Sequence, residues 1–335
     1  MEHRPSLDPA VAEVRRAVRA AFAGIDGPVL VGLSGGSDSL ALAAAVAFEA
    51  PKAGVSATAV VVDHRLQAGS ADIAARAAAS AQALGLPARV VRVEVGREGG
   101  PEAAARDARR AALRAAAVEA GAGAILLGHN LDDQAETVLL GLARGSGASS
   151  LAGMSPMRAD DDGLLWLRPL LSVRRATTRA ACAAEGLEPW DDPHNLDRRF
   201  LRVRVRHDVL PLLETELGPG VAEALARTAE QLREDADAFA EMIDETIEDI
   251  VEPAEAGIAV SVPALAANPP ALRHRIIRHV VASEFGASLT RTQTLDVARL
   301  ATDWTGQGPI DLPGCRATRT GRRIVFTASG APSSA

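Results

Sequence analysis

Ser34-Gly35-Gly36-Ser37-Asp38-Ser39 is the most informative segment of this sequence. It follows an apolar run at 28–33 (PVLVGL) and precedes an Ala-rich stretch at 38–49, which predict a buried strand and a helix. Two adjacent glycines permit a sharp turn and let backbone N–H groups approach an anion. The helix N-terminus behind them adds unpaired donors and the positive end of the helix dipole. The segment therefore predicts a phosphate-binding loop.

The first half of the chain repeats this alternation of strand and helix. Further strands are predicted at 58–62, 89–95 and 124–127, and helices at 70–84, 101–120 and 132–143. Near-continuous apolar strands alternating with helices predict an α/β fold with a doubly wound parallel sheet covered on both faces. Such sheets bind ligands at the carboxyl ends of their strands, so the loops at 34–37, 63–69 and 128–131 are the candidate site.

The second half predicts a different organisation. A Gly-, Ser- and Asp-rich loop is expected at 145–162, and then a helix from Ser172, as N-cap, to Glu185. We expect a catalytic domain at 1–215, an acidic helical linker at 216–255, a smaller α+β domain at 256–328 and a disordered tail at 329–335.

Composition limits the function classes. The 335 residues are 47% hydrophobic and 24% charged, and no apolar stretch of about 20 residues predicts a membrane span. The start MEHRPSLDPA does not resemble a signal peptide, so we expect a cytoplasmic protein without a membrane partner. Cys182 and Cys315 are too few for a disulfide framework or a four-cysteine zinc site and are expected to be buried. Oligomeric state stays open, with a homodimer as one option.

The loop is neither G-x-G-x-x-G nor G-x-x-x-x-G-K-[ST]. It lacks the lysine that grips β- and γ-phosphates, which disfavours kinase and P-loop ATPase chemistry. Asp38 either caps the helix or holds a Mg²⁺ ion that bridges phosphate oxygens.

At these residues the chain resembles the ATP pyrophosphatases, whose PP-loop reads S-G-G-x-D-S after a buried strand. The resemblance implies the PP-loop ATPase fold, which is like that of the adenine-nucleotide alpha-hydrolases, and adenylation of a carbonyl-type oxygen by ATP with release of pyrophosphate. The family includes tRNA thiolases and NAD synthetases, so the loop alone leaves the substrate open.

A second motif, GHNLDDQAET, occupies 128–137. If helical geometry extends back to His129, then His129, Asp133 and Glu136 share one polar face. Such a face beside a phosphate loop suits an ATP-linked site for a cationic amine. The alternative is a capping aspartate on a solvated helix face.

This motif closely resembles that of the tRNA(Ile)-lysidine synthetases. Val62-Asp63-His64-Arg65-Leu66 is similar to the family's V-D-H-G-L, with Arg65 in place of glycine. The run at 202–206, RVRVR, is similar to R-N-R-I-R, with Val203 in place of asparagine. The resemblance covers about 29–213.

The resemblance implies a ligase that forms a C–N bond on the wobble cytidine of an isoleucine tRNA with a CAU anticodon. ATP adenylates the C2 oxygen, and L-lysine then displaces AMP. By resemblance, Asp133 and Glu136 bind lysine, Asp38 holds Mg²⁺ and takes part in catalysis, and His129 orients the α-phosphate or takes the amine proton. The residues that it implies for ATP binding are Ser34, Gly35, Gly36, Ser37, Asp38, Ser39, Val62, His64 and Gly128.

Five arginines form a basic cluster that we expect to contact tRNA phosphates; the alternative is a solvated segment that reflects coding bias. They are Arg198, Arg199, Arg202, Arg204 and Arg206. Trp166, Trp190 and Trp304 are expected in the core. Two other functions compete: a tRNA thiolase, which would normally need clustered cysteines, and a non-catalytic ATP- or RNA-binding module.

Overall fold

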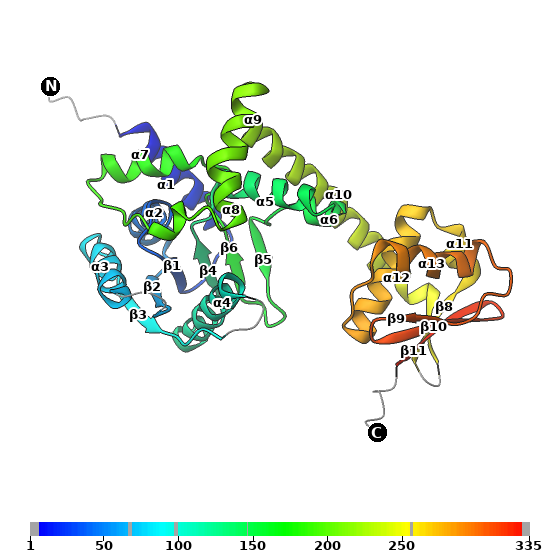
Figure 1. Ribbon diagram of the computed structural model, residues 1–335. Coiled ribbons are helices and arrows are strands. Elements are labelled where there is room, and N and C mark those ends of the chain that lie inside the picture. Colours follow the sequence, from blue (N-terminus) through cyan, green and yellow to red (C-terminus); the bar gives the residue numbers. More distant parts are fainter. Residues whose placement is uncertain (1–6, 66–68, 97–99, 146, 255–256, 330–335) are drawn as a thin grey trace. The chain divides into compact units, whose positions relative to one another are not determined.

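The computed structural model describes residues 7–65, 69–96, 100–145, 147–254 and 257–329 (Figure 1). The chain divides into two compact units, Met1–Arg233 and Glu234–Ala335. Their boundary falls inside the segment predicted as a linker, within helix α10 (Val221–Ile250). Residues 330–335 of the predicted tail lie outside the described residues. Among the described helices, none combines the length and the apolar character that crossing a bilayer would require.

Unit 1 is built on a six-stranded sheet in the order β3-β2-β1-β4-β6-β5. Five strands are parallel and β5 is antiparallel to β6. Their bounds are β1 Val29–Leu33, β2 Ala57–Asp63, β3 Ala88–Arg92, β4 Ala124–Leu127, β5 Met157–Ala159 and β6 Leu165–Leu167. Strands β2 and β4 flank β1 on opposite sides, so the strand order reverses beside β1 and β4. That reversal is where doubly wound sheets bind ligands.

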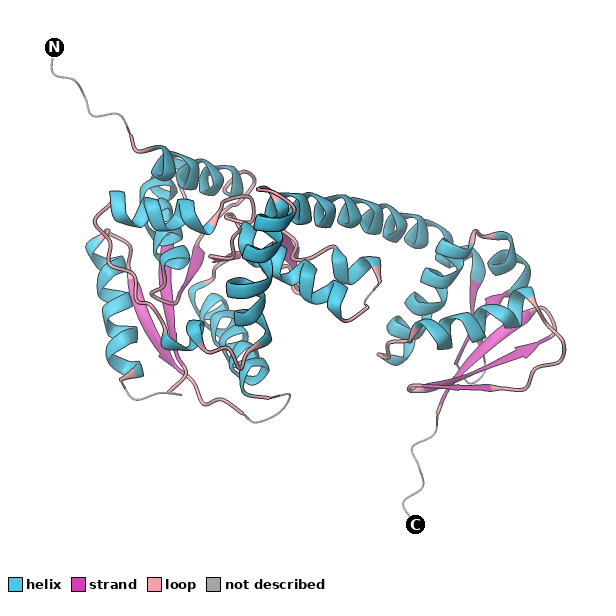
Figure 2. Cartoon of the chain, turned by 45° about the horizontal axis from the view of Figure 1, so that its top comes forward, coloured by secondary structure: helices cyan, strands magenta, loops and turns pink. Residues whose placement is uncertain are grey.

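Helices cover both faces of this sheet (Figure 2). Because successive strand residues point to opposite faces, Val29 and Val31 pack with one set of helices and Leu30 with another. The first set is α1 (Pro9–Ala21), α2 (Ser37–Ala53), α3 (Ser70–Ala83) and α7 (Arg175–Ala184). Helix α4 (Pro101–Ala120) covers the other face through Leu113. The predicted α/β doubly wound class is confirmed.

Helix α1 and strands β5 and β6 of unit 1 were not predicted from the sequence. Helix α1 buries Val11, Val14 and Val18 on one face, a helical spacing that went unassigned. Strand β5 lies inside the stretch predicted as loop at 145–162 and β6 follows it; with three residues each, they are too short to show an alternating pattern. Further short elements are α5 (Leu131–Ala143), α6 (Ala148–Leu151), η1 (Pro193–Leu196), α8 (Leu201–Arg204), η2 (Val205–Val209) and α9 (Leu210–Glu216).

Unit 2 is an antiparallel sheet in the order β7-β8-β11-β10-β9, with helices packed on it. The strands are β7 Val251–Ala254, β8 Gly257–Ser261, β9 Ile310–Leu312, β10 Cys315–Thr320 and β11 Arg323–Ala328. The helices are α11 Val262–Ala267, α12 Pro270–Phe285 and α13 Arg291–Thr302. Leu265, Ile276, Leu300 and Phe326 form its core. Cys182 in unit 1 and Cys315 here are both buried and free, as predicted.

Candidate active site

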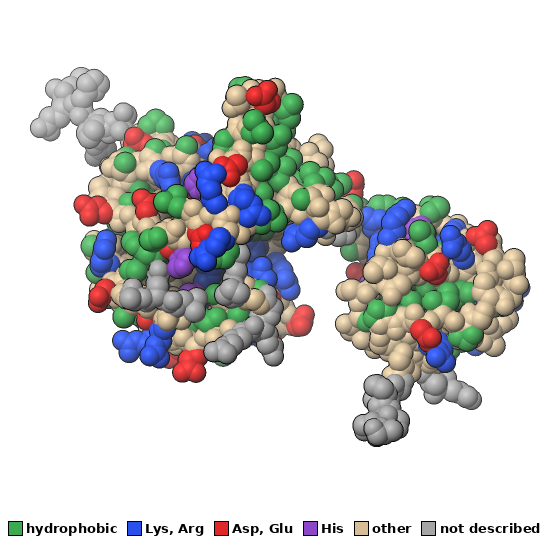
Figure 3. All heavy atoms as spheres, in the orientation of Figure 1, with side chains coloured by type: hydrophobic (Ala, Val, Ile, Leu, Met, Phe, Trp, Pro, Cys, Tyr) green, Lys and Arg blue, Asp and Glu red, His purple; other side chains and the backbone are tan. Residues whose placement is uncertain are grey.

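A cavity of about 850 Å³ lies in unit 1 at the carboxyl ends of β1, β2 and β4. Figure 3 shows Arg and His side chains gathered around a hollow on this face of unit 1. Most of the predicted site residues line it: Ser34, Gly36, Ser37, Asp38, Ser39, Val62, His64, Gly128, His129 and Asp133. Gly35 and Glu136 do not line the cavity. The structure therefore brings the glycine loop and the start of α5 into one chamber, although they are about 90 residues apart in sequence.

The glycine loop is held in shape by its own hydroxyl groups. Gly35 has φ +86°, a left-handed conformation that favours glycine. Ser39 Oγ accepts from the Ser34 N–H at 3.1 Å and donates to the Gly36 carbonyl at 3.0 Å, so this hydroxyl braces the turn. Gly36 is the N-cap of α2 and offers no side chain to its first-turn N–H groups. These donors are typical of an anion-binding helix N-terminus.

Gly128 lets α2 and β4 approach closely. A Cβ at this position would lie 3.0 Å from the Ser39 nitrogen and 3.1 Å from the carbonyl carbon and oxygen of Asp38. Backbone atoms cannot swing aside as a flexible side chain can. The absence of a side chain at Gly128 therefore sets the distance between the phosphate loop and the end of β4.

Helix α5 begins at Leu131, two residues later than a polar face that includes His129 would require. Asn130 is its N-cap: Asn130 Oδ1 accepts from the Asp133 N–H at 2.9 Å, and Asp133 Oδ2 accepts from the Asn130 N–H at 3.1 Å. Because this capping box ends the helix, helical geometry does not extend back to His129. His129 reaches the cavity from the segment between β4 and α5 instead, and only Asp133 and Glu136 share a helix face.

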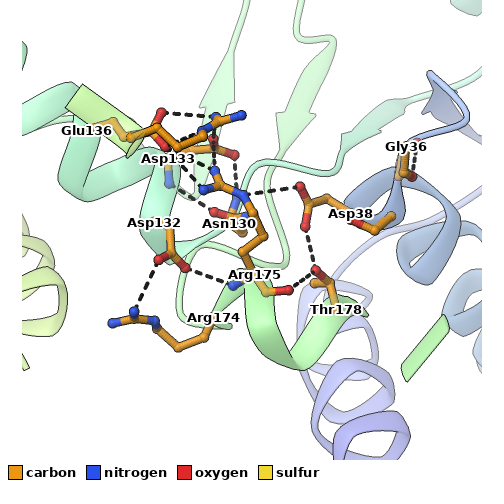
Figure 4. A network of polar contacts seen from close by, with 12 residues as sticks. Gly36, Asp38, Asn130, Asp132, Asp133, Glu136, Arg174, Arg175 and Thr178 are labelled. Atoms are coloured by element: carbon orange, nitrogen blue, oxygen red, sulfur yellow. Dashed lines mark hydrogen bonds and ion pairs between the residues drawn. The ribbon is translucent and has the colours of Figure 1, made fainter. Parts of the chain in front are cut away.

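Arg175, Arg202 and Arg206 surround Asp133 and Glu136 of α5; Figure 4 labels Arg175 and the two acids. Arg175 Nη2 lies 2.7 Å from Asp133 Oδ1 and 3.2 Å from Glu136 Oε1. Arg206 donates to both acids as well, at 3.0 Å to Asp133 Oδ1 and 2.7 Å to Glu136 Oε1, while Arg202 Nε lies 3.3 Å from Glu136 Oε2. Burial raises the pKa of Asp133, but Arg175 and the Asn130 N–H outweigh it, so this pKa lies below its usual value. Glu136 is fully buried.

The start of α7 explains how Arg175 reaches the acids. Ser172 was predicted as N-cap, but the helix begins at Arg175, and Asp132 Oδ2 accepts from the Arg175 N–H at 2.8 Å. The Asp132 side chain of α5 thus accepts a hydrogen bond from the first residue of α7, which lies 43 positions further along the chain. The sequence prediction failed here because the capping group is not local. Arg175 itself carried no signal in a chain where almost every basic residue is arginine.

Asp38 lies between the glycine loop and Arg175. Its Oδ1 accepts from Thr178 Oγ1 at 2.5 Å, and its Oδ2 lies 3.8 Å from Arg175 Nε. Burial raises the pKa of Asp38, partly offset by the Thr178 hydroxyl and Arg175. The described residues contain no cluster of three potential ligands for a metal ion. Mg²⁺ on a nucleotide needs only one or two protein carboxylates, because phosphate oxygens and water complete its shell, and Asp38 fits that requirement.

His64 and His129 present unpaired nitrogens at the cavity. Nδ1 of each is buried and has no hydrogen-bond partner among the described residues. Burial lowers the pKa of His129 to about 4, and burial together with Arg109 lowers the pKa of His64. The His129 ring is therefore neutral near pH 7.

The five clustered arginines divide into two groups. Arg198, Arg199 and Arg204 are exposed; the first two pair with Asp208 and Asp197, and Arg204 donates to the carbonyls of Arg198 and Arg199. Arg202 and Arg206 turn inward to the acids of α5.

The two residues that depart from the family motifs, Val203 and Arg65, each fit their local structure. Val203 is buried. Arg65 adopts φ +56°, the left-handed conformation that a glycine would provide, so the turn survives the substitution. Leu66 of this motif lies outside the described residues.

The prediction that all three tryptophans are core residues is right only for Trp166, which is 3% exposed. Trp304 is 38% exposed. Trp190 lines the cavity, and its backbone N–H donates to the Gly35 carbonyl at 2.9 Å.

Fold and site together define a PP-loop nucleotide-binding enzyme: the model of a PP-loop domain family matches residues 13–213. A second family model, the TilS substrate binding domain, matches residues 261–324. The chain belongs to the tRNA(Ile)-lysidine synthase family. It is 62% identical to the tRNA(Ile)-lysidine synthase of Leifsonia xyli over 89% of each chain, and 51% identical to that of Salinispora tropica over 97% of this chain and 99% of the relative.

Among solved structures, a U34-tRNA thiolase from Methanococcus maripaludis with a [4Fe-4S] cluster matches with a TM-score of 0.58. The match covers 67% of this chain and 80% of the thiolase at 21% identity, which shows a shared fold.

Proposed function

We propose that this chain is a tRNA(Ile)-lysidine synthase: it adenylates the C2 oxygen of the wobble cytidine in CAU-anticodon isoleucine tRNA with ATP, and L-lysine then displaces AMP. The observation that supports this most is the single cavity that joins the phosphate loop to the Asp133 carboxylate of α5. The activating nucleotide and the cationic lysine amine must both reach the same part of the cytidine. This cavity offers the glycine loop for the nucleotide and Asp133 for the amine.

In the first step the loop holds the pyrophosphate end of ATP. First-turn N–H groups of α2 and the hydroxyls of Ser34 and Ser37 supply donors for the charge that develops on pyrophosphate as it leaves. Asp38 would hold Mg²⁺, which supplies positive charge at the phosphate oxygens. Adenine would lie near Val62 and His64, at the end of β2.

In the second step the acids of α5 have separate roles. Asp133 lines the cavity, so its carboxylate can bind the lysine amine directly, with the ammonium group displacing a guanidinium group. Glu136 is fully buried and holds Arg175, Arg202 and Arg206 in place. His129 lines the same cavity and is neutral at pH 7, so its imidazole can hydrogen-bond the α-phosphate or the attacking amine.

Binding of tRNA falls to the exposed arginines and to unit 2. Arg198, Arg199 and Arg204 can exchange their weak surface contacts for phosphate oxygens. In unit 2, the matched TilS substrate binding domain supports a share in binding the same tRNA.

The test supplies purified protein with ATP, Mg²⁺, radiolabelled lysine and a CAU-anticodon isoleucine tRNA transcript. We expect label in the RNA with wild-type protein, and none with Asp38→Ala. Asp72→Ala is the matched control, because Asp72 is also an aspartate in the first turn of a helix but is exposed and does not line the cavity. Incorporation of sulfur instead of lysine would support the thiolase alternative and refute the proposal.

A further inference from the structure

The order of the strands leaves one side of the active site without an assigned ligand. The glycine loop follows β1, the proposed adenine position is at the end of β2, and the acids of α5 follow β4. Strand β6 extends the sheet on the other side of β4, away from β1 and β2 (Figure 1). Because β4 and β6 are parallel, their carboxyl ends meet at the same edge of the sheet. A polynucleotide substrate can reach the cavity past the end of β6 without crossing the position of ATP.

Arg168 lies at the carboxyl end of β6. Leu126 of β4 pairs with Leu167, so the next residue, Arg168, lies beside the end of β4, where the chain continues to His129. Burial lowers the pKa of His129 most, and the charge of Arg168 also lowers it, which agrees with this proximity. Arg168 is half-buried and does not itself line the cavity. It therefore borders the active site from the side of β6.

Arg168 has a donor that the protein does not use. Its Nη1 donates to the Ser155 carbonyl at 2.8 Å, but its buried Nε has no hydrogen-bond partner among the described residues. Burial lowers the pKa of Arg168, and the charges of Arg110 and Arg158 lower it further. The neighbouring charges that act on Arg168 are therefore positive, which favours an anion from outside the protein.

Arg158 extends this basic site to the edge of the sheet. It lies directly across from Trp166 of β6, and Arg168 follows Trp166 by two residues, so all three belong to the face that α4 covers. Arg110 of α4 lies over the Trp166 ring, 4.7 Å from its centroid, but is paired with Asp160 at 2.6 Å. Arg158 is exposed and forms no side-chain hydrogen bond or ion pair with any described residue. Two guanidinium groups without an acidic partner thus lie on this face, one beside His129 and one on the edge strand.

We propose that Arg158 and Arg168 bind the RNA backbone at the phosphates that flank the target cytidine. The inference rests on the proposed function, in which a nucleobase of the tRNA enters the cavity. A base that reaches the end of β4 leaves its flanking phosphates outside the cavity, where the glycine loop cannot neutralise them. Guanidinium groups suit this role, because their N–H groups match two phosphate oxygens at once. Contacts of this kind position the RNA without reading its sequence.

Fluorescence anisotropy of the full chain with a labelled anticodon stem-loop of the CAU isoleucine tRNA tests this assignment. Arg158→Gln and Arg168→Met are each expected to weaken RNA binding by about 3- to 10-fold and to lower the slope of log Kd against log salt by about 1, as loss of one phosphate contact predicts. ATP binding should stay as in the wild type, because neither side chain lines the cavity. Arg76→Gln is the matched control: Arg76 is also an exposed arginine without an ion pair to a described residue, but its helix α3 covers the other face of the sheet.

Stem-loops with one neutral methylphosphonate, immediately before or after the target cytidine, test the position of the contact. The wild type is expected to bind one of these RNAs about 3- to 10-fold more weakly than the unmodified RNA. The two arginine variants should bind that RNA and the unmodified RNA alike, because the contact is already lost. Equal losses in the variants and the wild type would overturn the assignment, as would wild-type RNA affinity in folded Arg158→Gln and Arg168→Met proteins.

Two features keep the outcome separate from folding and from the proposed reaction. Arg158 makes no side-chain contact with a described residue, so Arg158→Gln still tests the site if loss of the Ser155 contact lowers the Tm of Arg168→Met. The RNA titrations contain no lysine or ATP. A wild-type protein that makes no lysidine but shows the expected loss of RNA binding would therefore refute the proposed reaction and leave the RNA site in place.

Discussion

Gly128→Ala is the sharpest test of how the active site is assembled. The added methyl group would lie 3.0 Å from the Ser39 nitrogen and 3.1 Å from Asp38 backbone atoms, about 0.3–0.4 Å inside ordinary contact distance. All three contacts are with the backbone at the start of α2, so relief requires α2 to move relative to β4. We expect the phosphate loop to move with it.

The expected loss of stability follows from the added methyl group. Overpacking a well-packed site by one methyl group destabilises by about 1–3 kcal/mol. In a unit of this size, each kcal/mol lowers Tm by about 2–4 °C. Gly128 does not have a positive φ, so backbone strain adds nothing to this figure. We also expect ATP to bind at least about 10-fold more weakly, since a donor displaced by a few tenths of an ångström loses much of a charge-assisted hydrogen bond.

Scanning calorimetry of the full chain and ATP titration below the transition measure the two effects. Gly123→Ala is the matched control, because this glycine also borders β4 and its new Cβ would meet only the Asp26 carbonyl oxygen, at 3.6 Å. We expect the control to melt and bind ATP like the wild type. A Gly128→Ala protein that melts and binds ATP like the wild type would refute the argument that Gly128 sets the distance between α2 and β4.

Three further predictions concern the titratable groups of the site. Glu136→Gln should destabilise the protein by about 3 kcal/mol in urea unfolding, because it removes a buried charge that pairs with Arg175, Arg202 and Arg206; an unchanged midpoint would mean that these arginines find other partners. Asp133→Asn should raise the KM for lysine about 10-fold or more and that for ATP much less; the opposite pattern would contradict its role at the amine. The pKa of His129 is about 4 in the folded protein and 6.5 in the unfolded chain. Between these two pH values the unfolded state binds more protons than the folded state. The free energy of unfolding should therefore rise with pH across this window, by at most about 1.4 kcal/mol per pH unit. His129→Asn should flatten that rise, and an unchanged slope would show that other groups cause it.

The fold class was readable from local patterns. Four of the five parallel strands, β1 to β4, and the helices between them appear as apolar runs and amphipathic stretches whose bounds agree with the structure to within a few residues. The predicted helix at 132–143 agrees with α5 to within one residue, but its conditional extension to His129 fails, because the capping box of Asn130 and Asp133 marks the start of the helix. The phosphate loop was recognisable because a glycine turn before a helix is itself a local feature, as is the positive φ at Gly35.

Contacts between segments that are distant in the chain could not be predicted from the sequence. Arg175 and Arg206 meet Asp133 across 42 and 73 residues, and nothing in their own neighbourhoods marks them as different from the other arginines. Arg109 likewise differs from Arg110 by facing the cavity instead of an acid. Hydrophobic periodicity and turn chemistry act over a few residues, so they can be recognised in the sequence itself. Which charge faces which across the chamber depends on strand order and helix packing, and these arise only when the whole sheet has assembled.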